Sequence, residues 1–146
     1  MTGRKGYLFF ICSYWPATAT ASSFRESFDA ADFAGRTDVF QAQAGKPDRL
    51  GDDDGGHFIA ARFNGPSDSF NHFAQNANFN RGSYRVMEDS WAKELHAGHK
   101  VFVDIEPLYE GTSQRPYHLI VAWYVDGRKS FKEFPNEAKG AEDAKR

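Results

Sequence analysis

One histidine stands where it could carry out acid–base chemistry. In the stretch GDDDGGHFIAARFNG (residues 51–65), His57 follows three aspartates and two glycines. Histidine titrates near neutral pH, so it suits a general base that removes a proton from water. The clustered Gly, Pro and Asp residues predict a loop over residues 44–56. The mostly apolar residues from His57 to Phe63 predict a strand that starts at the histidine.

An asparagine-rich segment follows, and it could supply oxygen ligands for a hard cation. Residues 64–82 contain five asparagines together with Gln75. Asparagine competes for backbone hydrogen bonds and favours loops and caps, so this segment is predicted to be a loop. Its three phenylalanines indicate that the loop packs against the body of the domain. Amide and carboxylate oxygens are ligands that suit Mg²⁺.

An acidic side chain lies on the inward edge of the clearest predicted helix, residues 83–97. Four apolar residues recur there at spacings of three, four and four: Tyr84, Met87, Trp91 and Leu95. On a helical wheel, Glu88 falls about 55° from the centre of this stripe. Because burying an unpaired charge is costly, Glu88 needs a partner or a metal there. The alternative is an edge glutamate that reaches water or pairs with a nearby arginine.

The elements that position these residues are predicted to include an antiparallel sheet. Strands are expected over residues 100–110, 117–125 and 128–134, with a type I′ turn at Asp126-Gly127. Residues 23–43 are expected to add two strands, the second of which contains Val39 and Phe40. His96 and His99 could bind a metal, although their place at the end of the helix favours capping.

Composition limits the classes of function. The chain has 146 residues and a formal net charge of −2, so it fits one domain without a global basic surface. A polyanionic substrate would therefore need a local basic site. The single cysteine, Cys12, excludes an intramolecular disulfide and a cysteine-rich zinc site.

The first 22 residues have two interpretations. A basic start, an apolar run and small residues near Ala17–Ala21 are typical of a secretory signal peptide. The alternative is an extra N-terminal strand. The apolar run is too short to span a bilayer as a helix, so we expect no stable membrane association. Residues 23–136 are expected to form the functional domain, and residues 137–146 a charged tail.

Several motifs occur together in one order. They are DDDGGHFIAARFNGPSDSFN, QNANFNRGSYRVME, Trp91, VDIEPLYEG and the Arg115-Pro116 pair. In this order they resemble the DNA/RNA non-specific endonuclease family, of the ββα-metal (His-Me finger) superfamily. The similarity is closest to the branch found as toxin domains of bacterial secreted effectors. The resemblance implies an α+β fold: an antiparallel sheet core with a finger made of the strand, the Asn-rich loop and helix 83–97.

The resemblance also implies a role for each motif residue. His57 would be the general base, Asn80 the direct ligand of a hydrated Mg²⁺, and Glu88 the holder of the metal's water shell. Mn²⁺ would be expected to substitute for Mg²⁺. Asn71 would orient His57 or its neighbours. The supporting residues would be Asp54, Gly56 and Gln75.

One position departs from the family. Many relatives carry an arginine before the motif glycine, where this chain has Gly55. That arginine would help to neutralise the transition state. Arg81 and then Arg115 are the first candidates for this catalytic role. The candidates for substrate binding are Arg62, Arg81, Arg85 and Arg115.

The expected function is Mg²⁺-dependent, non-specific hydrolysis of phosphodiester bonds in DNA, RNA or both. The setting would be a bacterial toxin or secreted nuclease, cytoplasmic before export, with an immunity protein as partner if it is a toxin. The alternative is a nucleic-acid-binding module of the same fold that has lost catalysis, which the glycine at position 55 motivates.

Overall fold

The computed structural model describes residues 7–11 and 39–138, which form two antiparallel sheets and one long, kinked helix. The larger sheet has the strand order β1-β4-β5-β6. Its strands are β1 (Tyr7–Ile11), β4 (Val101–Tyr109), β5 (Pro116–Val125) and β6 (Arg128–Pro135). The smaller sheet is a hairpin of β2 (Asp53–His57) and β3 (His72–Asn76). These antiparallel sheets with a helix confirm the predicted α+β class.

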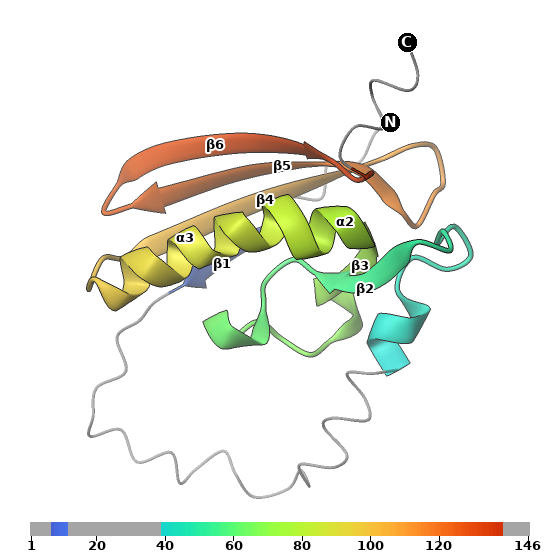
Figure 1. Cartoon of the computed structure of the whole chain (residues 1–146), viewed down its shortest axis with the longest axis horizontal. Helices are drawn as coiled ribbons and strands as arrows, with labels where there is room; N and C mark the ends of the chain where they lie inside the picture. The colour runs from blue at the N-terminus through green and yellow to red at the C-terminus, as the bar shows by residue number, and fades with distance from the viewer. Residues whose placement is uncertain (1–6, 12–38, 139–146) are drawn as a thin grey trace, which may run out of the picture.

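The helix runs along the four-stranded sheet, and the hairpin lies at the end where the helix begins (Figure 1). It consists of α2 (Ala77–Phe79), the π-helical turn η3 (Asn80–Tyr84) and α3 (Arg85–His96). A kink falls at Gly82, whose φ of −103° and ψ of −106° are not helical. The predicted helix 83–97 is confirmed, and helical structure extends further towards the N-terminus than the sequence indicated.

The core forms between the apolar stripe of this helix and one face of the larger sheet. Trp91 and Tyr84 are fully buried, as are Val101, Val103 and Ile105 at alternate positions of β4. Alternation of this kind is expected where only one face of a sheet packs on the core. The predicted strands 100–110, 117–125 and 128–134 are therefore confirmed within a residue at each end.

The turn between β5 and β6 has the geometry that its sequence predicts. Asp126 has a φ of 48° and Gly127 a φ of 83°. Positive φ at both central residues defines the type I′ turn, whose twist matches that of the flanking strands. The Asp-Gly pair thus fixes the register of the hairpin that closes the sheet.

Three predictions about the first half of the chain were wrong. Val39 and Phe40 begin a short helical segment, residues 39–43, rather than lying in a strand. The strand near the histidine ends at His57 instead of starting there. Part of the Asn-rich segment, which was predicted to be a loop, forms β3 and pairs with β2. Residues 23–38, for which strands were also predicted, lie outside the described residues, as do residues 139–146 of the predicted tail.

Each difference has a physical reason. Arg49 donates to the carbonyls of Gln41 and Ala42, which satisfies the end of the 39–43 helix. After His57, the peptide groups of Ile59 bond to the Asn71 side chain and not to a neighbouring strand. A strand cannot continue there because its ladder partners are replaced.

The N-terminal segment Tyr7–Ile11 pairs antiparallel with β4 at the edge of the sheet. This is the arrangement that an extra N-terminal strand would adopt, while removal of a signal peptide stays a prediction. Among the described residues, none of the helices combines the length and apolarity needed to cross a bilayer.

Candidate active site

The candidate site lies between β2 and the helix, which touch at two points. Near one end, the Asn80 Nδ2 donates to Asp54 Oδ2 over 2.9 Å. Near the other, His57 Nε2 lies 3.3 Å from Glu88 Oε1. Three strand residues rise about 10 Å and eight helical residues about 12 Å, so the two spacings match. The structure therefore aligns strand and helix in the same direction and brings four of the predicted residues together.

His57 and Glu88 form the central pair of the site. The His57 side chain is 29 % exposed and the Glu88 side chain only 7 % exposed. The Nε2 atom of the imidazole is buried against the carboxylate. No described residue hydrogen-bonds to Nδ1. A neutral imidazole whose Nε2–H points at Glu88 would therefore present Nδ1 as the accessible basic nitrogen.

Glu88 also lies near a cation. Arg62 Nη2 is 3.7 Å from Glu88 Oε2, and Arg62 Nη1 is 2.7 Å from Asp89 Oδ1. The guanidinium sits over the Phe63 ring, at the end of the 3-10 turn η1 (Ala61–Phe63), 4.9 Å from the centroid. Glu88 is buried and has both His57 and Arg62 as charged or titratable neighbours, so the expected partner and the alternative pairing with an arginine occur together. Oε1 of this carboxylate is buried and makes no hydrogen bond to a described residue.

Asn71 fixes the chain directly after the histidine. It ends the 3-10 turn η2 (Ser69–Asn71) and is 2 % exposed. Its Oδ1 accepts from Ile59 N, and its Nδ2 donates to the carbonyls of Ile59 and Pro66. The buried Tyr84 hydroxyl donates to Phe58 O over 2.7 Å. Both residues after His57 are thus held, in line with the expectation that Asn71 orients the neighbours of the base.

The hydroxyl of Tyr84 stays protonated in this environment. Burial, together with the nearby negative charge of Glu88, raises the pKa of Tyr84 well above its ordinary value. The phenol can then serve as a donor to Phe58 over the whole neutral range. The sequence predicted Tyr84 only as a core residue of the helix stripe. It did not predict this hydrogen bond from the helix to the residue after His57.

Asp54 organises the other end of the site. It accepts from Asn80 and, in a bidentate arrangement, from Arg81 Nε at 3.0 Å and Nη2 at 2.7 Å. The hydrogen bond from Arg81 is the main reason that the pKa of Asp54 is lowered. Since Asn80 uses its amide nitrogen towards Asp54, its Oδ1 is left without a bond to any described residue. That hard oxygen donor is what a magnesium ligand requires, so the residues present fit the expected metal.

Close packing requires glycine both at the motif position, Gly56, and at the preceding position, Gly55. A Cβ at Gly56 would overlap the side chain of Gln75, which is fully buried against it. A Cβ at Gly55 would overlap the backbone oxygen of Gln41. Gln41 of the 39–43 helix therefore occupies the space that any side chain at position 55 would need.

The predicted arginines have three different surroundings. Arg62 and Arg81 lie at the site, with side chains 42 % and 73 % exposed. Arg85 is exposed on the first turn of α3 and pairs with no described residue.

Arg115 is not brought to the site. It donates to Asp53 at 2.7 and 2.8 Å and to Asn136 O at 2.9 Å. The fully buried Asp53 carboxylate bonds to Arg115, whereas the carboxylate of the neighbouring Asp54 bonds to Asn80 and Arg81 at the site. Arg115 therefore anchors the hairpin to the sheet.

Sequence reasoning missed Asn136. This buried residue accepts from Asn76 N and donates to the carbonyls of Ala74 and Pro116. Asn76 in turn caps α2 by accepting from Asn78 N and Phe79 N. The end of β6 thus positions the start of the helix that carries Asn80. A lone asparagine after a strand carries no signal of this role in a single sequence.

The two histidines at the end of α3 do not form a metal site. His96 Nδ1 contacts Ala92 O at 2.6 Å, whereas His99 Nδ1 lies 2.6 Å from Asp126 Oδ2. Within the part of the chain that the structure describes, no three His, Cys, Asp or Glu side chains are grouped as metal ligands. The contacts support roles at the helix end rather than metal binding.

The β2–β3 hairpin that carries His57 is followed along the chain by the helix that carries Asn80 and Glu88, and comparison with known proteins identifies the family. The chain matches the DNA/RNA non-specific endonuclease family over residues 22–127 and belongs to this family. It is also similar to the type VII secretion system protein EssD of Staphylococcus aureus, in strains USA300 and NCTC 8325 / PS 47. The identity is 36 % over 103 residues, which is 66 % of this chain and 17 % of each relative. The chain therefore corresponds to about a sixth of these proteins.

Proposed function

We propose that this domain hydrolyses phosphodiester bonds of DNA, RNA or both, with Mg²⁺ as cofactor and Mn²⁺ as a substitute. Family membership supports nuclease activity in general. The metal and the mechanism rest on the aligned pairs His57–Glu88 and Asn80–Asp54. The carrying observation is the buried contact of 3.3 Å between His57 and Glu88, which aims the other ring nitrogen outward.

In the proposed reaction, His57 takes a proton from the attacking water at Nδ1. Nε2 of the ring faces the Glu88 carboxylate at 3.3 Å, and the negative charge of that carboxylate would stabilise the imidazolium that forms. Asn71 and Tyr84 keep the ring in place through the residues that follow it. The metal, held directly by Asn80 Oδ1 and through water by Glu88, would stabilise charge on the phosphate and the leaving oxygen.

We propose that Arg81 and Arg62 replace the arginine that position 55 cannot hold. Both arginine side chains are at least 42 % exposed at the side of the site. Asp54 holds Arg81 through two hydrogen bonds, and Asp89 holds Arg62 through one. A phosphate offers either guanidinium a similar bidentate partner. Arg115 has no part in this proposal.

The test is digestion of plasmid DNA and of RNA by the wild type, His57→Ala and Glu88→Gln, with Mg²⁺ and with EDTA. General base catalysis contributes about 10²- to 10⁴-fold, so His57→Ala should lose that much activity while remaining folded. His96→Ala, at an exposed histidine outside the site, is the matched control. Full activity of His57→Ala, or of the wild type in EDTA, would refute the assignment.

The second candidate is a module of the same family that binds nucleic acid without cleaving it. The observation that favours it is Gly55, where the family arginine is sterically excluded. A binder would retain affinity for DNA or RNA but produce no cleavage during prolonged incubation with Mg²⁺ or Mn²⁺. The same incubation with His57→Ala as a blank separates the two candidates.

We also propose that the domain acts as a secreted or delivered effector, made in the cytoplasm before export and neutralised there by an immunity protein. The similarity to a protein named as part of a type VII secretion system supports this setting. Expression in a bacterial host should then arrest growth, and His57→Ala should not. Mass spectrometry of the exported protein would reveal cleavage after Ala21 if residues 1–22 include a signal peptide.

A further inference from the structure

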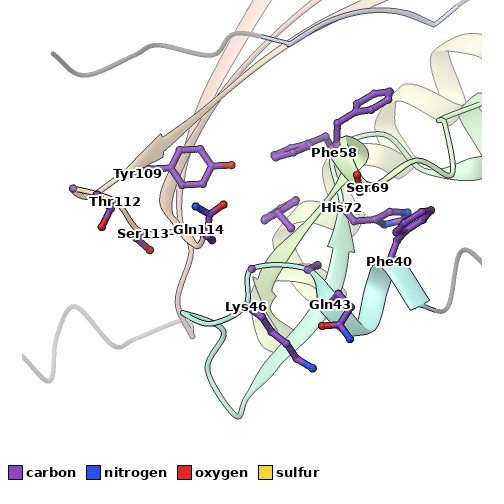
Figure 2. A pocket seen from close by; sticks show the side chains of 15 residues that line it. Phe40, Gln43, Lys46, Phe58, Ser69, His72, Tyr109, Thr112, Ser113 and Gln114 are labelled. Atoms are coloured by element: carbon purple, nitrogen blue, oxygen red, sulfur yellow. The ribbon is translucent and has the colours of Figure 1, made fainter.

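A cleft of about 560 Å³ opens beside the catalytic hairpin, and the proposed mechanism does not use it. One wall comes from the 39–43 helix and the residues after it, including Gln43 and Lys46. The facing wall is the connection between β4 and β5, with Thr112 and Gln114 (Figure 2). This volume falls in the range of sites that hold small organic ligands.

The cleft lies next to the proposed base, although His57 itself does not line it. His72, one of its lining residues, is directly opposite His57 in the β2–β3 register. Opposite residues in an antiparallel pair have Cβ atoms about 5 Å apart. Phe58, which follows His57 in the chain, also lines the cleft. A nucleotide flanking the bond that the water activated by His57 attacks would therefore be within reach of the cleft.

The lining combines the groups that recognise an unstacked base. Phe70, beside the cleft, is 50 % exposed although it is a large apolar residue. Amide and hydroxyl groups of Gln43, Ser69 and Gln114 line the same space, and Lys46 adds a positive charge. Aromatic faces stack on bases of any sequence, amides and hydroxyls bond to base edges, and a cation meets the backbone.

We infer that this cleft binds one unpaired nucleobase beside the scissile phosphate, and that the domain therefore prefers single-stranded over duplex substrate. A paired base is stacked inside the helix and cannot enter such a cleft unless it is extruded, which costs free energy. The inference rests on the proposed nuclease function for the position of the scissile bond. It adds the substrate class and assigns Phe70 as the stacking platform.

Binding is measured with His57→Ala protein and a six-nucleotide DNA strand that carries one 2-aminopurine, a base whose fluorescence changes on stacking. The probe base is moved along the strand from one sample to the next. A saturable signal at one or two positions is expected, and adding Phe70→Ala should weaken it by about 5- to 150-fold, the range for one base–aromatic stack. Thr112→Trp, which narrows the cleft, should act in the same direction.

The matched control is Phe131→Ala, which removes a phenylalanine that is 55 % exposed on β6. It should leave binding unchanged. Near-ultraviolet circular dichroism verifies the fold of each variant. Equal affinity of Phe70→Ala, Thr112→Trp and the control would overturn the base-binding cleft.

Activity separates this inference from the proposed function. The wild type should cleave single strands faster than duplex, and Phe70→Ala should lose that difference while still cutting duplex. Cleavage with no strand preference, and no effect of Phe70→Ala, would leave the nuclease standing and refute the cleft. Probe binding that depends on Phe70 without any cleavage by the wild type would refute the nuclease and retain the cleft as a nucleotide site.

Discussion

Replacing Arg115 with alanine is expected to destabilise the fold rather than to impair the chemistry directly. The Arg115 side chain is 13 % exposed, and that of its partner Asp53 is fully buried. Removing one member of a buried ion pair leaves an uncompensated charge and costs about 3–5 kcal/mol. Domains are stable by about 5–15 kcal/mol, so this loss is a large fraction of the total.

Urea denaturation followed by tryptophan fluorescence measures the effect. With slopes of about 1–3 kcal/mol per molar urea, the midpoint should fall by about 1 M or more. Asp53→Asn should also lower it, and the double variant should lose less than the sum of the two singles. Arg81→Ala is the control, because its exposed pair with Asp54 should hardly affect the midpoint.

Cleavage assays on the same samples decide between anchor and substrate contact. Well below the melting transition, Arg115→Ala should retain most of the wild-type rate, whereas Arg81→Ala should lose activity without losing stability. If Arg115→Ala had the same urea midpoint as the wild type and yet failed to cleave, the reasoning would be refuted. Arg115 would then be assigned to substrate binding.

Three further outcomes are expected, each followed through urea midpoints. Gly55→Arg should lower the midpoint without raising activity, because any Cβ there overlaps the backbone of Gln41; a stable and more active variant would contradict this. The pKa of Tyr84 is raised in the folded state. Its hydroxyl therefore contributes fully to the free energy of unfolding below pH 10, and this contribution is lost as the pH rises through the folded-state pKa. The urea midpoint of Tyr84→Phe should therefore fall less steeply with rising alkaline pH than that of the wild type. Identical slopes for the two proteins would argue against this role of Tyr84. The pKa of Asp54 is lowered in the folded state. Its carboxylate therefore contributes fully to the free energy of unfolding above its ordinary pKa of 3.8, and this contribution is lost as the pH falls through the folded-state pKa. The urea midpoint of Asp54→Asn should fall less steeply as the pH is lowered. An acid dependence equal to that of the wild type would exclude this contribution of Asp54.

The elements that the sequence predicted correctly depend on local patterns. The stripe of Tyr84, Met87 and Trp91 repeats at the helical period, and all three residues are buried as expected. The Asp126-Gly127 turn and the alternation of β4 are equally local. Glu88 was placed on the inward edge by the same wheel, and its burial confirms that part of the site geometry.

The errors arise where side chains take over the bonding of the backbone. An apolar run such as Phe58–Ile59 suggests a strand, but its peptide groups bond to the Asn71 amide. A single sequence does not reveal which asparagine will be buried and which will face water. The count of asparagines indicated loops, whereas Asn71 and Asn76 act as internal bonding groups that allow a hairpin and a helix cap to form.

Arg115 shows the same limit for charged residues. From the sequence, an arginine near a strand looks the same whether it meets a phosphate or a buried aspartate. The difference comes from Asp53, 62 positions earlier in the chain. Long-range pairs of this kind decide which arginines are available to a substrate, and only the folded arrangement shows them.

The bond from Asn136 to Asn76 spans 60 positions, and it has a consequence for synthesis on the ribosome. The polypeptide emerges from its N-terminal side, so every residue of the proposed site has left the ribosome well before Asn136 does. Until then, the cap of the helix that bears Asn80 lacks its support from β6. We therefore expect a chain that is stalled or truncated before Asn136 to form this end of the helix less stably than the full chain.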